Sequence, residues 1–377
     1  MFSHSSDRVA IAASAQTQLR PAWDDRQHVD LISDAVVAVL KGSGIRLEDV
    51  DFVIDSGSDI LDGRSISNCG FLGALGAHHK EESRVEEDGL WAALYASTKI
   101  AAGAAEIGLV VAYSKPSESD LGAFYATQCE PFYQRPVGFD HVAASGIQAQ
   151  LYLDRTDATQ DSFGDVVAHD WANAVANPWV DTDGAPTLDE VRASELRAAP
   201  LRALDFSRQV DGAVAVLLVS QRVAAKMDVD PVWITGIGTA MDQHAFALRD
   251  PAALPACDVA AKQAYRRAGI ADPKRASLVE TGAGTVAGEL LVLEALGLAD
   301  RGHGADLFTD GSQTAINPSG GSLPADPIMA TGLLRLSAAA LQLAGRVDHA
   351  PPEASTAIVH GAGGVGLQNH CVFTLEV

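Results

Sequence analysis

The sequence predicts an α/β protein in which two similar halves stack their helices and sheets into a five-layered core. A repeat links Gly44-Ile45 with Gly269-Ile270, and in both copies a second glycine follows thirteen residues after the first. Apolar residues make up 47% of the 377 residues but aromatic residues only 6%, which is typical of helices packed closely on parallel strands. Each half also contains a continuous apolar strand, as expected for strands that are buried on both faces.

The elements of the two copies follow the same order. Each copy begins with a short apolar strand, an amphipathic helix and a second strand, which is the order of a βαβ unit. Each continues with an Ala-rich helix that leads to a buried strand. In the first copy we expect these elements at 8–12, 31–41, 52–57, 89–102 and 107–113. In the second copy we expect them at 231–236, 259–268, 277–282, 331–343 and 356–360.

Residues 115–205 interrupt this pattern. They are richer in Asp, Pro, Tyr and Trp and show weaker periodicity, so we interpret them as an inserted loop domain. The chain returns to the core with the apolar strand 210–219. The expected domains are therefore an N-terminal half at 1–114 plus 206–228, the loop domain at 115–205, and a C-terminal half at 229–377.

Composition excludes several classes of partner. A formal net charge of −22 disfavours nucleic acid and anionic membranes. The four cysteines, at positions 69, 129, 257 and 371, lack metal-ligand spacing, so we expect free thiols in a reducing cytoplasm and no bound metal. The first residues lack the regions of a signal peptide, and no apolar run reaches the length of a membrane span. These features predict a cytoplasmic protein.

Several motifs then identify a family resemblance. The stretch from Asn317 to Gly332 (NPSGGSLPADPIMATG) is similar to the segment of thiolases that carries their catalytic histidine. Gly103-Ala104-Ala105-Glu106 and Asp211-Gly212-Ala213, each beside an apolar strand, also match, as do Asn173-Ala174 and Asn177-Pro178. The chain thus resembles the thiolase superfamily, in particular sterol-carrier-protein-like thiolases and thiolase-like acyl-CoA aldolases of the lipid-transfer-protein type. The resemblance implies the thiolase fold, with duplicated βαβαβαββ halves in an αβαβα core.

The resemblance also places the family's catalytic positions on this sequence. The nucleophilic cysteine falls on Glu86, and the histidine before the second proline falls on Asp326. The Asn or His that holds an oxyanion-hole water falls on or near Thr281. His360 begins the last glycine-rich motif, where the family has a cysteine or histidine. Only His360 is compatible with the usual thiolase chemistry.

A carboxylate at the nucleophile position changes the expected reaction. Glu86 cannot hold an acyl group as a thiolate does, because the anhydride would hydrolyse. A retro-aldol cleavage of a 3-hydroxyacyl-CoA needs no covalent intermediate, only proton transfers, for which Asp326, Glu86 and His360 are suitable residue types. The enolate that forms needs hydrogen-bond donors, which we expect at Gly89, Thr281, Gly363 and Gly364.

The resemblance further implies a coenzyme A thioester as substrate, with no cofactor bound to this chain. Candidate CoA-binding residues are Arg192, Arg197, Arg202, Ser319 and Gly320. A homodimer is expected through the strand that follows the nucleophile helix, at about 107–114. The aldolases of this type work with a small OB-fold, zinc-ribbon partner, so such a second subunit is a further expectation.

Simpler interpretations of these residues stay open. Glu86-Glu87-Asp88 precede a helix, where acidic residues ordinarily complement the helix dipole. Asp326 is in position to cap the helix that follows it, and His360 to be a core histidine. Two other functions also remain: a non-catalytic thiolase-like subunit of a complex, and an acyl-CoA acyltransferase with Cys69 as an atypical nucleophile.

Overall fold

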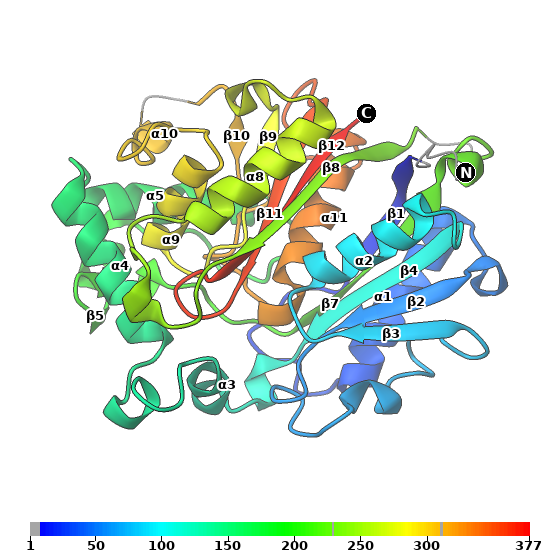
Figure 1. Cartoon of the computed structure of the whole chain (residues 1–377), viewed down its shortest axis with the longest axis horizontal. Coiled ribbons are helices and arrows are strands. Elements are labelled where there is room, and N and C mark those ends of the chain that lie inside the picture. Colours follow the sequence, from blue (N-terminus) through cyan, green and yellow to red (C-terminus); the bar gives the residue numbers. More distant parts are fainter. Residues whose placement is uncertain (1–7, 228–229, 310–311) are drawn as a thin grey trace.

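The computed structural model describes residues 8–227, 230–309 and 312–377 and contains a ten-stranded sheet with helices on both faces (Figure 1). The strand order is β10-β9-β11-β12-β8-β1-β7-β4-β2-β3. The N-terminal half supplies β1 (Val9–Gln16), β2 (Phe52–Ser56), β3 (Glu81–Val85), β4 (Ile107–Ser114) and β7 (Gly212–Ser220). The C-terminal half supplies β8 (Val232–Met241), β9 (Leu278–Glu280), β10 (Ala315–Ile316), β11 (Thr356–Gly363) and β12 (Asn369–Glu376).

Both halves have the same internal strand order, so the duplication expected from the repeat is confirmed. Counted from the first strand of its own half, each half has the order 3-2-4-5-1. The halves meet where β1 pairs antiparallel with β8, in register from Val9 opposite Ile234 to Ile11 opposite Val232. The repeated glycines that follow the first helix of each half end those helices, with φ of 71° at Gly44 and 72° at Gly269. Glycine adopts this left-handed conformation at low cost.

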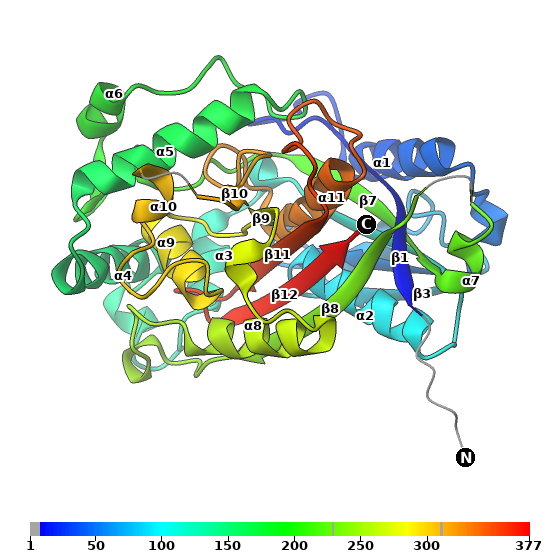
Figure 2. The same ribbon diagram turned by 90° about the horizontal axis from the view of Figure 1, so that it is seen from above.

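The helices arrange the two half-sheets into five layers (Figures 1 and 2). Helix α1 (His28–Ser43) covers the outer face of the N-terminal half, and α8 (Pro255–Ala268) covers the outer face of the C-terminal half. Between the half-sheets, α2 (Gly89–Ala101) and α11 (Thr331–Leu343) pack on each other in one continuous apolar core. Helix α9 (Val286–Ala295) adds to the outer layer of the C-terminal half.

Residues 115–205 add no strand to the large sheet. They form α3 (Leu121–Thr127), α4 (His141–Arg155), α5 (Gln160–Val175), α6 (Leu188–Ala193) and a two-stranded ribbon of β5 (Leu196–Ala198) and β6 (Leu201–Arg202). Side chains of α4 and α5 share the apolar core of α8 and α9. The segment is therefore more helical than its weak periodicity predicted. Its helices start at polar N-caps such as Asp140 and Thr159. Their buried faces are narrow and rich in Ala and Val, so the apolar periodicity in the sequence is weak.

The exposed edge of the N-terminal half differs from the sequence expectation. The strand at 107–114 is β4, which lies inside the sheet between β2 and β7 and has no free edge for pairing with a second chain. The outer strand is β3, which the sequence analysis did not predict because Glu81-Glu82-Ser83-Arg84 is almost wholly polar. Short helices complete the fold at Gln221–Ala224 (α7) and Asp306–Thr309 (α10). None of the helices among the described residues has the length and apolar character that crossing a membrane requires.

Candidate active site

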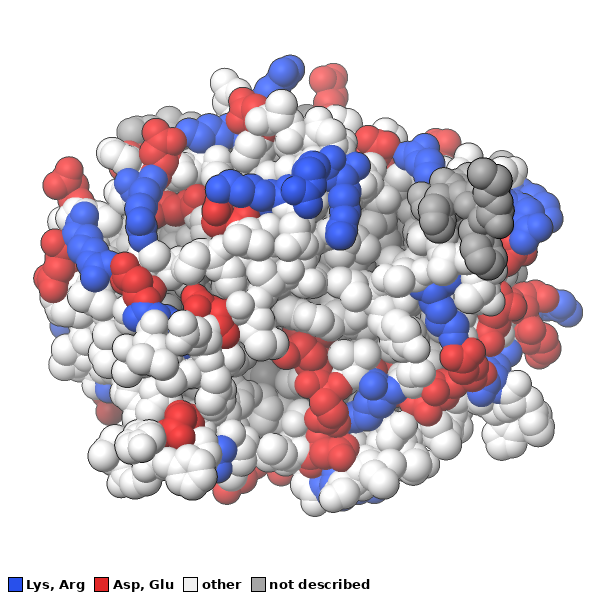
Figure 3. All heavy atoms as spheres, in the orientation of Figure 1, with Lys and Arg blue, Asp and Glu red and all other residues white. Residues whose placement is uncertain are grey.

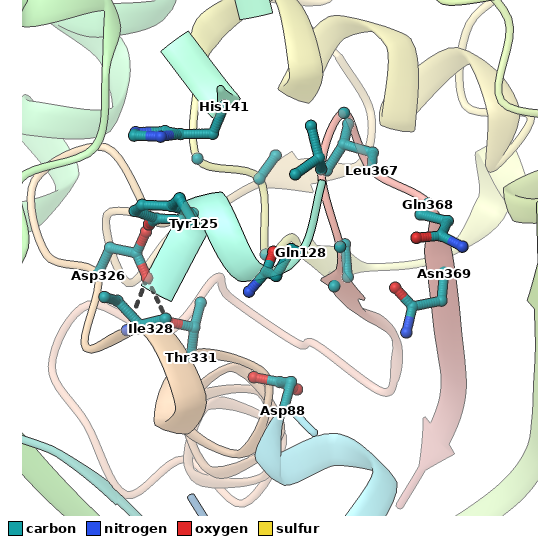
Figure 4. A pocket seen from close by; sticks show the side chains of 18 of the residues that line it. Asp88, Tyr125, Gln128, His141, Asp326, Ile328, Thr331, Leu367, Gln368 and Asn369 are labelled. Carbon is teal, nitrogen blue, oxygen red and sulfur yellow. Dashed lines mark hydrogen bonds between the residues drawn. The ribbon is translucent and has the colours of Figure 1, made fainter. Parts of the chain in front are cut away.

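A cavity of about 480 Å³ lies where both halves and residues 115–205 meet. Its wall contains the residues before α2, the start of α11, the end of β11 and the turn that follows it, together with parts of α3 and α4 (Figure 4). The sequence positions expected to carry chemistry are thus brought near one another by segments from the whole chain. In this cavity Asp326 and Glu86 both contribute to the wall, whereas His360 does not.

Asp326 is a buried carboxylate held by three donors. Its Oδ2 accepts a hydrogen bond from the Ser207 hydroxyl at 2.7 Å. Its Oδ1 accepts from the Thr331 hydroxyl at 2.6 Å and from the Ile328 backbone N–H at 3.0 Å, as Figure 4 shows. The carboxylate thus orders the turn before α11, as the capping interpretation expected in part. It also lines the cavity, so its position suits a proton acceptor whose geometry is fixed before substrate binds.

The three acidic residues before α2 have different surroundings. Glu86 lies at the rim with its side chain about half exposed, accepting from Arg84 Nε at 2.9 Å and from the Asp59 N–H. Glu87 points inward and accepts from the Asn369 side-chain amide at 2.5 Å, and burial raises the pKa of its carboxyl. Glu86, which the sequence analysis placed at the position of the nucleophile, is therefore paired with Arg84 at the rim of the cavity. Its neighbour Glu87 lies deeper, which residue counting alone did not reveal.

Asp88 is the N-cap of α2, as the helix-dipole interpretation expected. One carboxylate oxygen accepts from the Leu90 N–H at 2.9 Å, and the other accepts from the Gly332 N–H at the start of α11 at 2.7 Å. Burial raises the pKa of Asp88 to about 7. One side chain thus holds the N-termini of both central helices, and these two N-termini face the cavity floor.

His360 does not reach the cavity. It is fully buried, and its Nε2 lies 3.0 Å from Nδ1 of His370, whose Nε2 lies 3.0 Å from the Leu367 carbonyl. The next residue, Gly361, faces Asp88, and side chains alternate along a strand, so His360 points to the opposite face of β11. Burial lowers its pKa well below the usual value. The core-histidine interpretation describes this residue.

The residues expected to support an enolate divide into two groups. Gly363 and Gly364 line the cavity, and a Cβ on Gly363 would collide with the Glu87 carboxylate. Thr281 and Gly89 are not part of the wall. The Thr281 N–H and hydroxyl both donate to the Asn317 side chain, and Gly89 is packed against its neighbours between the two central helices.

Two residues that the sequence analysis did not single out, Tyr125 and His141, form part of the opposite wall. The rings of Tyr125 and His141 stack with centroids 3.7 Å apart and planes inclined by 22°. In Figure 4 the Tyr125 ring lies between His141 and Asp326. Burial raises the pKa of Tyr125, with a further contribution from the Asp326 charge, and burial lowers that of His141 to about 4. No motif marks this segment, so only the fold could reveal these residues.

Of the five residues expected to bind CoA, only Arg197 borders the cavity, where its guanidinium lies 4.7 Å from the Phe206 ring centre. Arg192 pairs with Asp161 at 3.0 Å on the surface, and Arg202 donates to the Ser194 carbonyl at 2.8 Å. Ser319 and Gly320 are buried away from the cavity, where the Ser319 hydroxyl donates to Glu280 at 2.7 Å. On the face drawn in Figure 3, Lys and Arg side chains gather over α8.

No cysteine is among the described residues of the cavity wall. Cys69 is exposed in a short turn at Ser67–Gly70, and the other three thiols are buried, with burial raising their pKa values. Among the described residues, one group has the composition of a metal site: Cys257, His360 and His370, whose ligand atoms lie within 4.8 Å of one another. This group is on the far side of β11 from the cavity wall.

Comparison with known proteins finds similarity to thiolases and thiolase-like proteins in both sequence and structure. Residues 238–376 match the family model described as thiolase C-terminal domain-like. The chain is 25% identical to the acetyl-CoA acetyltransferase of Methanothermobacter thermautotrophicus, over 95% of this chain and 97% of that protein. It is 28% identical to the steroid side-chain-cleaving aldolase of Thermomonospora curvata, over 79% of each chain. The solved structure of the Ltp2–ChsH2(DUF35) aldolase superposes with a TM-score of 0.84, at 23% identity and 98% coverage of both chains. The expected resemblance and the expected fold are confirmed.

Proposed function

Because this chain has the thiolase fold but no thiol among the described residues of its cavity wall, we propose that it acts on acyl-CoA thioesters by proton transfer alone. The reaction we propose is retro-aldol cleavage of a 3-hydroxyacyl-CoA, or its reverse. The observation that carries the proposal is Asp326, a preorganised carboxylate in the cavity at the position where thiolases have their catalytic histidine. The aldolase named among the relatives supports the same reaction class.

In the proposed reaction Asp326 accepts the proton of the 3-hydroxyl group. The C2–C3 bond then breaks, C3 leaves as an aldehyde or ketone, and the electron pair of the bond passes to C2 and the thioester carbonyl as an enolate. No acyl–enzyme bond forms, so the absence of a thiolate from the described wall is no obstacle. The positioned carboxylate supplies general base catalysis, which typically contributes about 10²–10⁴ in rate.

The Glu87–Asn369 pair is our candidate for enolate support. Asn369 is buried, and its amide N–H₂ donates to Glu87. Its Oδ1 has no hydrogen-bond partner among the described residues and lies beside Gly363. This role requires the Asn369 amide to turn by about 180°: a protonated Glu87, which burial favours, then donates to the Asn369 oxygen, and the Asn369 N–H₂ can donate to the enolate. Removing one such donor from an oxyanion site costs about 10²–10³ in rate.

The acyl group and partners are also proposals. Apolar side chains such as Ile60, Phe124, Met241 and Leu367 share the wall with the polar groups, which suits a bulky acyl group. The name of the structural neighbour pairs its aldolase chain with a second protein, ChsH2(DUF35). We therefore keep a small OB-fold, zinc-ribbon subunit as the proposed partner. A homodimer that forms through a sheet edge would use β3 or β10, the two edge strands, rather than β4.

The proposal is tested by incubating the protein, with and without such a partner, with 3-hydroxyacyl-CoA esters that carry bulky side chains. We expect a shorter acyl-CoA and a carbonyl product in equal amounts. Asp326→Asn should lower turnover by at least about 100-fold. Asp34→Asn, at an exposed site on α1, serves as the control and should leave turnover unchanged.

A second candidate, a non-catalytic subunit, is favoured by one observation: the Glu86 carboxylate, although at the cavity rim, is already bound by the Arg84 guanidinium and the Asp59 N–H. Cleavage by the purified chain in the absence of any cysteine-bearing homologue would exclude this role. Cleavage that appears only when such a homologue is added, and that is equal for wild type and Asp326→Asn, would establish it.

A further inference from the structure

The proposed cleavage leaves one proton transfer unassigned. After the C2–C3 bond breaks, C2 of the enolate must gain a proton before the shorter acyl-CoA can leave. Asp326 at that moment holds the proton of the former hydroxyl group. We propose, on the basis of this proposed function, that Tyr125 is the catalytic residue that donates the proton to C2 and that Asp326 then restores the proton of Tyr125.

The position of Tyr125 is fixed by aromatic contacts. The residue lies on α3, and its ring forms part of the cavity wall. The His141 imidazole stacks on it with centroids 3.7 Å apart, and the Phe124 ring packs against it edge-on with centroids 5.1 Å apart. Rings held in this way lose little further freedom when substrate binds, so the position of the Tyr125 ring is set before the reaction starts.

The phenol has the protonation state that a donor needs. Burial and the charge of Asp326 both raise the pKa of Tyr125, so the hydroxyl keeps its proton at neutral pH. Tyr125 and Asp326 line the same cavity, and Figure 4 shows the Tyr125 ring beside Asp326. Burial lowers the pKa of His141 to about 4, so the stacked imidazole is neutral at pH 7 and does not compete as a cation.

The chemistry requires two adjacent protein groups, and Tyr125 and Asp326 provide them. The hydroxyl oxygen and C2 are both bonded to C3, so the groups that serve them must lie side by side. The O–H proton goes to Asp326, the Tyr125 proton goes to C2, and the Asp326 proton then goes to the phenolate. No proton is gained or lost, and both side chains return to their starting states. Glu87 is the other candidate proton donor. Its carboxyl, however, accepts hydrogen bonds from Asn369 and from the Asp88 N–H and packs against Gly363, so it is already engaged.

Deuterium exchange at C2 tests the assignment, because the reverse of C2 protonation removes a C2 proton from the product. Propionyl-CoA in D₂O serves as the probe, with mass spectrometry as the readout. Tyr125→Phe keeps the ring and its stacking partner, so its thermal midpoint and its affinity for propionyl-CoA should match wild type. We expect exchange to fall by at least about 100-fold in Tyr125→Phe. The control Tyr133→Phe alters a tyrosine of the same segment that is 82% exposed, and should exchange within twofold of wild type.

Exchange by Tyr125→Phe within threefold of wild type would overturn the assignment. His141 provides a second test: His141→Ala removes the stack and should slow exchange, whereas His141→Phe restores a stacking ring and should recover most of it. Failure of His141→Phe to recover would show that the imidazole itself moves the proton, and would also overturn the assignment. Wild-type protein that exchanges C2 but cleaves no 3-hydroxyacyl-CoA would instead contradict the proposed function and leave the role of Tyr125 standing.

Discussion

The Ser207 hydroxyl donates a 2.7 Å hydrogen bond to Oδ2 of Asp326, although the two residues lie 119 positions apart in the sequence. Ser207 lies where the chain returns from residues 115–205 to the core, and its N–H bonds the Gly284 carbonyl in the cavity wall. Asp326 lies in the turn before α11. Its other carboxylate oxygen, Oδ1, accepts hydrogen bonds from the Ile328 N–H and the Thr331 hydroxyl. The proposed base is therefore positioned from two separate parts of the chain.

Ser207→Ala should impair catalysis without unfolding the protein. A hydrogen bond to a charged group contributes about 1.5–3 kcal/mol, so losing this one should lower kcat/KM by roughly 10–100-fold. The two remaining donors keep the carboxylate in place, so the thermal midpoint should change little. Steady-state kinetics beside a melting curve make the test. A fall in thermal midpoint with no change in kcat/KM would show that the bond is purely structural.

Asn369→Ala should lower kcat more than it raises KM, because a donor to the enolate acts mainly in the transition state. We expect a loss of about 100-fold or more. Glu87→Gln keeps an amide in contact with Asn369 and should be milder. Equal effects of Asn369→Ala on kcat and on the affinity for a substrate analogue would contradict this role.

Asp88 should make stability depend on pH. Burial raises its pKa to about 7, against its usual 3.8, so the folded protein binds a proton between these values that the unfolded chain releases. Its contribution is therefore fully present below about pH 4 and is lost as pH rises through 7. Asp88→Asn cannot titrate. The unfolding free energy of wild type minus that of Asp88→Asn should fall between pH 5 and 8, by at most about 1.4 kcal/mol per pH unit. Chemical denaturation at each pH measures it, and a flat or rising difference would refute the prediction.

Cys69 should be chemically accessible but dispensable. It is the exposed cysteine of the four, and it lies outside the cavity wall. Iodoacetamide should therefore label Cys69 in the folded protein, and Cys69→Ala should keep wild-type turnover. Cys257→Ala offers a comparison at a buried thiol, where the cost should be in stability. Loss of turnover in Cys69→Ala at unchanged stability would revive the acyltransferase alternative.

The sequence predicted the central elements because they carry strong local signals. The helix expected at 331–343 is α11 at the same residues, and the helix expected at 89–102 differs from α2 by one residue. Helix α9 was not predicted, since eight consecutive residues from Val286 to Leu293 are buried and leave no polar face to reveal a period. Strand β3 was not predicted for the opposite reason: its residues are almost all polar, so the sequence shows no alternation of apolar and polar residues.

The site was predictable only where a motif fixed a position. Asp326 stood out because it replaces a histidine inside a recognisable segment. The first part of that segment has a structural role, since Asn317 donates to the buried Glu289 at 2.8 Å and Ser319 to Glu280. The direction of a side chain could not be predicted from the sequence. His360 is close in sequence to Ala362 and Gly363 of the cavity wall, but its side chain lies on the opposite face of β11. Tyr125 belongs to a segment without a motif, and its proximity to Asp326 depends on the packing of three distant parts of the chain.

The most direct test of the central claim combines product analysis with the intact mass of the protein. The protein, with its partner where one is required, is incubated with a 3-hydroxyacyl-CoA and sampled during turnover. A reaction by proton transfer alone predicts a shorter acyl-CoA, an equal amount of aldehyde or ketone, and an unmodified protein mass at every time. An acyl group covalently attached to a cysteine, and released by added coenzyme A, would contradict the account.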